Sequence, residues 1–211
     1  MKWHELLRFV SDEPIFHSAL LMTAGVGRAE VEKQLSRWTR AGKLVQLRRG
    51  LYALAAPYGK RPPLPFLVAN ELRRPSYVSL QSALAYYGMI PEYVPSVTSV
   101  TTGRPGQART PLGVFIYRHI KTPLFAGYRR IEVADSQSAF IATPEKGLLD
   151  LIYLTPHGDE AGYLEELRLQ NLEALDLKAL VETARASGSA KLMRAAKRVA
   201  AIAGEEEYVD L

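Results

Sequence analysis

Four prolines and one glycine stand within the nine residues 57–65, and this segment limits what the chain can fold into. Each proline lacks an amide donor and disfavours helix in the residue before it. No regular helix or central strand is therefore expected to run through the segment. It is predicted to be a semi-rigid linker between an N-terminal domain, residues 1–56, and a C-terminal domain, residues 66–211.

The charge balance of the chain changes at the same place. Residues 1–61 hold 11 Lys and Arg against 5 Asp and Glu, whereas residues 62–211 hold 16 against 17. The positive excess thus belongs to the N-terminal segment. Attraction to a polyanion such as double-stranded DNA would be a property of that segment alone.

Composition excludes several other classes of protein. The chain has no cysteine, so it can form neither disulfides nor a cysteine-based zinc site. No apolar run approaches the ~18 residues of a membrane span, and the N-terminus shows no signal-peptide core. We therefore expect a cytoplasmic protein with no membrane partner.

The N-terminal segment has the pattern of a winged helix-turn-helix. Apolar residues at helical spacing predict a first helix near residues 3–10, and a second is predicted from about 15 to 24. A Gly-Val-Gly turn at 25–27 leads to a third helix from about 28 to 41. The stretch VQLRRGLYAL, residues 45–54, then reads as a hairpin, which would form the wing.

The third helix separates apolar from basic side chains. On a wheel of ~100° per residue, Val31, Leu35 and Trp38 share one arc of about 60°. The roughly opposite arc holds Lys33, Arg37 and Arg40. In a helix-turn-helix this outward face enters the major groove, where Arg and Lys bind phosphates or guanine and Gln can read adenine.

The hairpin carries two further cations at its tip, Arg48 and Arg49, where they could contact phosphates or a narrow minor groove. Gly50 is predicted to supply the positive φ of the turn. The apolar residues of the hairpin, Val45, Leu47, Tyr52 and Leu54, are expected to hold it on the core. The predicted DNA contacts are Arg28, Lys33, Gln34, Arg37, Arg40, Arg48 and Arg49.

The C-terminal segment predicts an α+β domain with a small mixed β-sheet and flanking helices. Strands are expected near 97–102, 114–119, 128–133 and 139–142, with a loop at 103–106. Helices are expected near 66–72, 79–87, from Thr143 onward, and near 159–170, 176–186 and 189–203. Thr143 and Ser79 are the predicted N-caps.

Four segments in order resemble antitoxins of the AbiEi type, from abortive-infection (type IV) toxin–antitoxin systems. They are LVQLRRGLYAL, PSYVSLQSALAYYGMIPEYVPSVTSVTT, VFIYRHI and ATPEKGLLDLIYL, and the resemblance covers about residues 4–155. It implies a winged-helix domain that represses its own operon by binding promoter repeats. It also implies a C-terminal antitoxin domain that counteracts a nucleotidyltransferase-like toxin, with or without direct contact.

Two other functions remain open on the sequence alone. The first is a protein-interaction adaptor whose winged helix docks a partner protein. The second is a metal-dependent nuclease, for which Glu132, Asp135, Glu145, Lys146 and Asp150 are the candidates. Asp150 can instead pair with Lys146 at i, i+4 on an exposed helix face. The antitoxin interpretation expects no catalytic residue, no metal and no cofactor.

Overall fold

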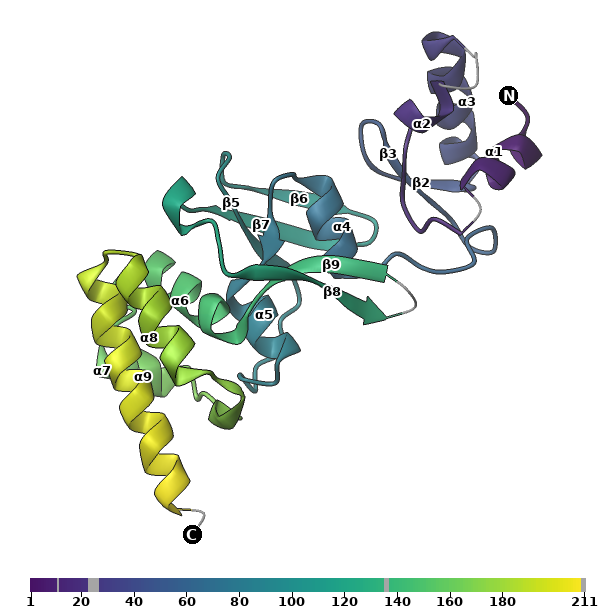
Figure 1. Cartoon of the computed structure of the whole chain (residues 1–211). Coiled ribbons are helices and arrows are strands. Elements are labelled where there is room, and N and C mark those ends of the chain that lie inside the picture. Colours follow the sequence, from purple (N-terminus) through teal and green to yellow (C-terminus); the bar gives the residue numbers. More distant parts are fainter. Residues whose placement is uncertain (11, 23–26, 135–136, 210–211) are drawn as a thin grey trace.

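The computed structural model describes residues 1–10, 12–22, 27–134 and 137–209. Two modules adjoin end to end: an N-terminal module whose last strand ends at residue 54, and a C-terminal module whose first helix begins at residue 65. The first and last described residues lie at opposite ends of the molecule (Figure 1). Each module has its own sheet with helices packed on it. The mixed α+β class predicted from the sequence is confirmed.

The N-terminal module is a winged helix-turn-helix. Its elements are α1 (Trp3–Val10), β1 (Phe16–His17), α2 (Ala19–Met22), α3 (Arg28–Arg40), β2 (Leu44–Arg48) and β3 (Leu51–Leu54). The strands form an antiparallel sheet in the order β1-β3-β2. Val31, Leu35 and Trp38 of α3 are buried, as the helical wheel predicts. Gly50 in the β2–β3 turn has φ +79°, which confirms its predicted role.

The second helix differs from its prediction. Residues 16–17 form β1, which pairs with β3, where the sequence pattern had predicted the start of a helix. Phe16 lies opposite Tyr52 in this pairing, and burial of both rings outweighs the local helical spacing. Residues 25 and 26 of the predicted turn lie outside the described residues.

The three-stranded sheet is buried on both faces. Leu44, Tyr52 and Leu54 belong to the cluster formed with the helices of the N-terminal module. Leu47, Leu51 and Ala53 belong instead to the large cluster of the C-terminal module. Val45 packs against that second cluster too. The expectation that one core holds the hairpin is therefore wrong, because alternate residues of a strand face opposite sides.

A register shift in β2 decides where Arg48 points. Gln46 pairs with Tyr52, but Arg48 pairs with Leu51, so Leu47 is the extra residue of a bulge. Residues directly opposite each other in an antiparallel pair share a face. Arg48 consequently lies on the side of Leu51, which faces the C-terminal module.

The linker segment, residues 57–65, is held to both modules. Gln137, which is buried, donates from Nε2 to the Pro62 carbonyl at 2.9 Å and accepts from the Leu64 amide at 2.9 Å. The Tyr58 ring meets Trp3 edge-on, with centroids 5.1 Å apart. The division of the chain into 1–56, 57–65 and 66–211 stays a prediction, but the segment between the modules is anchored.

The C-terminal module is built on a mixed sheet with the order β6-β7-β5-β4-β9-β8. Its strands are β4 (Tyr77–Val78), β5 (Val97–Thr101), β6 (Gly106–Thr110), β7 (Gly113–His119), β8 (Tyr128–Ala134) and β9 (Gln137–Ala142). Its α-helices are α4 (Pro65–Leu72), α5 (Leu80–Tyr86), α6 (Pro144–Leu154), α7 (Ala161–Glu166), α8 (Leu177–Ala186) and α9 (Ala190–Val209), with short 3₁₀ helices η1 (Thr122–Leu124) and η2 (Leu172–Ala174). The strand pattern predicted β5, β7, β8 and β9, whereas it missed β4 and β6.

Helix α6 lies at the centre of the helical part, between α5, α8 and α9 (Figure 1). Thr143 caps it by accepting from the Lys146 amide, as predicted. The Lys146–Asp150 ion pair forms, but both side chains are buried rather than exposed. Tyr77 and Ser79 donate to Asp150 Oδ2 at 2.9 and 2.7 Å. The helix has no solvent face here because other helices and the sheet cover it.

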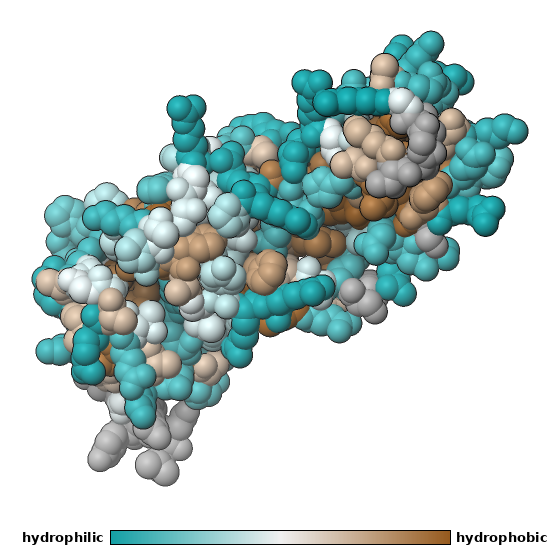
Figure 2. Space-filling model, turned by 45° about the horizontal axis from the view of Figure 1, so that its top comes forward, coloured by the Kyte–Doolittle hydropathy of each residue, from teal (hydrophilic) through white to brown (hydrophobic). Residues whose placement is uncertain are grey.

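Within the described ranges, no helix is long and apolar enough to cross a membrane. Hydrophilic side chains cover much of the outer part of the N-terminal module, at the upper right of Figure 2, and hydrophobic residues gather where it meets the larger module. Leu47, Leu51 and Ala53 are buried below the surface, in the cluster of the C-terminal module.

Candidate nucleic-acid interface

A groove of about 610 Å³ separates α3 from the wing. Three of the predicted contact residues, Arg28, Arg40 and Arg49, line it. Its other lining residues are Ser18, Met22, Glu32, Leu35, Ser36, Thr39, Gln46, Gly50 and Tyr52. The fold thus brings cations from both ends of α3 and from the wing to the same depression.

The two arginines of α3 that line the groove, Arg28 and Arg40, are each positioned by a partner one turn away. Arg28 Nε lies 3.0 Å from Glu32 Oε1, and Arg40 Nη2 donates to Ser36 Oγ at 3.1 Å. The Arg28–Glu32 pair is exposed, so its contribution to stability is small, about 0.3–0.5 kcal/mol. Both guanidiniums are held along the groove by weak contacts that a phosphate could replace.

A second set of predicted residues lies on the outer ridge of α3 and does not line the groove. Lys33 and Arg37 are exposed, and within the described part of the chain neither side chain has a hydrogen bond or ion pair. Gln34 Nε2 donates to Glu30 Oε1 at 2.7 Å. The helix therefore offers cations over a broad arc, with Gln34 at its far border.

The two wing arginines point to different places. Arg49 lines the groove beside Tyr52. Burial, and after it Glu32, raises the pKa of the Tyr52 hydroxyl, and Arg49 opposes part of this rise. Arg48 follows the bulge and donates from Nη2 to the Glu71 carbonyl of α4 at 3.4 Å. Both arginines remain exposed. The hairpin thus offers Arg49 to a ligand of the groove and Arg48 to the junction between the modules.

Sequence reasoning missed the polar lining of the groove. Ser18, Gln46 and Ser36 could donate to phosphate oxygens, and Glu32 introduces one negative charge among the three arginines. The i, i+4 spacing of Arg28 and Glu32 was visible in the sequence and predicts their pair. The positions of Ser18 and Gln46 depend on how β1 and β2 join the sheet, which local spacing does not reveal.

The nuclease candidates do not form a site in the described residues. Glu132 is exposed on β8, Glu145 Oε1 accepts from the Asp176 amide at 2.9 Å, and Asp150 is paired with Lys146. Burial raises the pKa of Asp150 and of Tyr77, while Lys146 opposes the rise for Asp150. Asp135 lies outside the described residues. No group of three or more acidic, histidine or cysteine side chains in the described ranges could hold a metal.

The module that carries the groove matches a known family. Residues 4–55 match the family model described as a transcriptional regulator, the AbiEi antitoxin. The match runs from α1 through β3 and leaves the larger module outside. A search of curated proteins finds no match. The resemblance to AbiEi-type antitoxins is confirmed for this N-terminal module.

Proposed function

We propose that this chain, whose N-terminal module is that of an AbiEi-type transcriptional regulator, is a DNA-binding antitoxin that represses its own operon. The observation that carries the DNA-binding part is the groove between α3 and the wing, with Arg28, Arg40 and Arg49 along it. Helix α3 would enter the major groove, and the wing would lie over the flanking backbone.

The proposed contacts have different roles. Arg28, Arg40 and Arg49 would bind phosphates that border the major groove, because guanidinium groups bind phosphate through charge-assisted hydrogen bonds. Lys33 and Arg37 lie on the outer ridge of α3, where they would meet base edges or phosphates. Gln34 would read a base only after leaving Glu30. Arg48 would reach DNA beyond the wing.

Binding to DNA from the chain's own promoter tests this proposal. We expect an affinity that falls steeply with salt, because each phosphate contact releases counterions. The Arg40→Ala, Arg49→Ala double variant should bind DNA more weakly. Its slope of log binding constant against log salt concentration should be shallower by about one for each lost contact. Arg109→Ala, an exposed arginine on β6, is the matched control. Equal affinity and equal salt dependence in the double variant would refute the groove as the DNA site.

The antitoxin activity is proposed for the C-terminal module, on the resemblance of residues 76–155 to the family. The toxin would be a nucleotidyltransferase-like protein encoded beside this chain. Co-expression of the two genes tests this part, since growth should recover when the chain is produced with an active toxin. Failure to recover would remove the antitoxin proposal and leave the DNA-binding proposal intact.

A further inference from the structure

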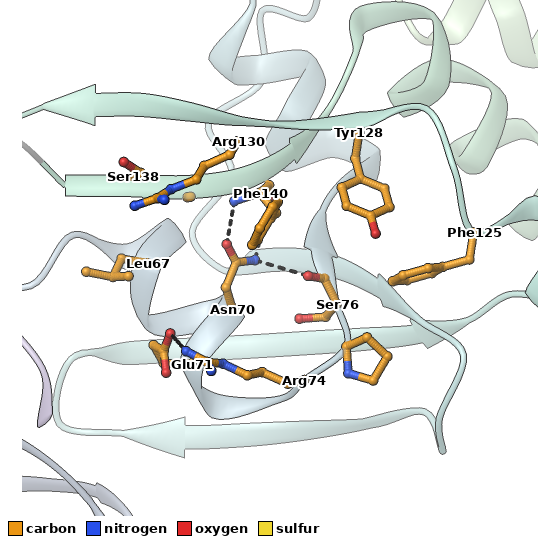
Figure 3. A pocket seen from close by; sticks show the side chains of 12 residues that line it. Leu67, Asn70, Glu71, Arg74, Ser76, Phe125, Tyr128, Arg130, Ser138 and Phe140 are labelled. Carbon is orange, nitrogen blue, oxygen red and sulfur yellow. Dashed lines mark hydrogen bonds and ion pairs between the residues drawn. The ribbon is translucent and has the colours of Figure 1, made fainter. Parts of the chain in front are cut away.

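A second cavity, of about 490 Å³, lies in the C-terminal module, away from the α3 groove. It is bounded by the end of α4 with the residues after it, and by β8 and β9 (Figure 3). The six side chains that matter here are Glu71, Arg74, Phe125, Tyr128, Arg130 and Phe140. Its volume falls in the range of small-molecule sites, about 300–1,000 Å³.

Three aromatic rings form one part of this cavity. Phe140 is 43% exposed, and its ring meets the Tyr128 ring edge-on with centroids 5.9 Å apart. The centroid of the Phe125 ring lies 5.2 Å from that of the Tyr128 ring. The buried Tyr77 ring stacks on the Tyr128 ring, with centroids 4.5 Å apart and an interplanar angle of 15°. This stacking fixes the position of the Tyr128 ring. The cavity therefore presents an aromatic surface that neighbouring rings hold in place and that is partly open to solvent at Phe140.

Two arginines reach the same cavity from opposite sides (Figure 3). Arg130 comes from β8, directly opposite Phe140 in the β8–β9 register. Within the described ranges, its guanidinium has neither a hydrogen bond nor an ion pair. Arg74 comes from the chain after α4 and pairs with Glu71. One unpaired cation thus lies beside an exposed aromatic ring, with a second cation across the cavity.

The wall between these groups is already ordered. Asn70 is buried, accepts from the Phe140 amide at 2.6 Å, and donates to the carbonyls of Phe140 and Ser76 at 3.4 and 3.5 Å. These hydrogen bonds hold β9 against α4 at the base of the cavity (Figure 3). A ligand would therefore meet a preformed site and would not have to order it, which lowers the cost of binding.

We propose that this cavity binds a nucleoside monophosphate. Its base would stack on Phe140 and Tyr128, since aromatic side chains bind the π face of any base. Its phosphate would meet Arg130, with Arg74 able to turn from Glu71 toward it. A wholly apolar ligand would leave the Arg130 charge unused, and a simple anion would leave the rings exposed. This inference does not depend on the DNA-binding proposal, because the two sites share no residue.

Isothermal titration of the full-length protein with AMP, GMP, CMP and UMP tests the site. We expect saturable binding of at least one nucleotide, and binding at least tenfold weaker for the corresponding nucleoside without phosphate. Arg130→Gln should weaken nucleotide binding about tenfold through the loss of a charge-assisted contact. Phe140→Leu should weaken it by a similar factor through the loss of stacking.

Two controls keep the test decisive. Arg109→Gln removes another exposed arginine, from the opposite edge strand of the same sheet, and should bind nucleotide as the unaltered protein does. The circular dichroism spectrum and melting temperature of each variant report whether it is folded. Absence of saturable binding by all four nucleotides, unchanged affinity in folded Arg130→Gln, or equal loss in Arg109→Gln would each overturn the proposal.

Discussion

The Nε2 atom of His17 in β1 lies 3.0 Å from Oε2 of Glu71 in α4, so one hydrogen bond joins the wing's sheet to the larger module. Glu71 also pairs with Arg74, and its backbone carbonyl accepts from Arg48. His17 lies opposite Leu51 in the β1–β3 pairing, on the sheet face that the C-terminal module covers. The two modules thus meet through both polar and apolar contacts.

This hydrogen bond should be measurable as a coupling between the modules. We expect a double-mutant cycle of His17→Ala and Glu71→Gln to give a coupling of about 0.5–1 kcal/mol in the free energy of urea unfolding. The value is modest because the His17 side chain is 42% exposed. A cycle with His157 and Glu160, which form a pair within the C-terminal module, provides the comparison. A coupling of zero would mean that the His17–Glu71 hydrogen bond does not stabilise the junction between the modules.

The single wing variants should differ. We expect Arg49→Ala to weaken promoter binding more than Arg48→Ala does, because Arg49 lines the α3 groove and Arg48 contacts Glu71. Loss of one phosphate contact makes the slope of log binding constant against log salt concentration shallower by about one. Fluorescence anisotropy of labelled promoter DNA at several salt concentrations measures both quantities. A larger loss in Arg48→Ala would contradict the assignment of Arg49 as the main DNA contact of the wing.

Leu51 should matter to the stability of the whole protein. Its side chain is fully buried in the cluster shared with the C-terminal module, so Leu51→Ala should lower the free energy of unfolding by about 2–5 kcal/mol. Leu20→Ala should lower the free energy of unfolding much less, because Leu20 is 47% exposed. Urea denaturation followed by circular dichroism compares them. Similar losses of unfolding free energy in the two variants would contradict the burial of Leu51 in the cluster that it shares with the C-terminal module.

The buried Lys146–Asp150 pair should show strong coupling. Asp150→Asn keeps one carbonyl oxygen that can accept from both Tyr77 and Ser79 but leaves the Lys146 ammonium without its buried counter-ion, which costs about 3–5 kcal/mol. Adding Lys146→Met removes that charge and should recover a large part of the loss. The double variant should therefore be more stable than Asp150→Asn in chemical denaturation. If it is less stable, the two charges do not depend on each other.

Lys146→Met alone should change how stability depends on pH. Burial raises the pKa of Asp150 in the folded state above its value in the unfolded chain, so the folded state holds this proton more tightly. The free energy of unfolding then falls as pH rises above about 4, the ordinary range of an aspartate. Loss of Lys146 strengthens the effect because the cation opposes the rise. Denaturation curves between acidic and neutral pH should show a steeper fall in the variant than in the unaltered protein.

The two proposed activities should separate by mutation. We expect the Arg40→Ala, Arg49→Ala variant to neutralise the toxin as well as the unaltered protein does, because both side chains belong to the α3 groove. Growth of cells that produce the toxin and the variant measures this. Loss of protection by a folded variant would contradict the assignment of antitoxin activity to the C-terminal module.

Local patterns in the sequence predicted much of this structure. The burial of Val31, Leu35 and Trp38 in α3 follows from helical spacing, and the positive φ of Gly50 follows from the tight turn. The cap at Thr143 also follows from local chemistry. These features depend on neighbours within a few residues, which is the range that a sequence pattern reports.

Features that depend on distant partners were not predictable in this way. Strand β4 has only two residues and exists because β5 and β9 pair with its two edges. Ser79 occupies the predicted cap position of α5, yet its hydroxyl donates to Asp150, far along the chain. The direction of Arg48 depends on one bulge, and one extra residue in a strand reverses which face a side chain occupies.

Burial of the wing's sheet on both sides has a consequence for how this chain can be shortened or joined to another. A fragment ending near residue 56 would expose Leu47, Leu51 and Ala53 to water, and an uncovered apolar strand invites aggregation. The N-terminal module therefore depends on its neighbour to keep these side chains from water. A chimaera that joins it to a foreign domain would need a surface shaped to cover those three side chains.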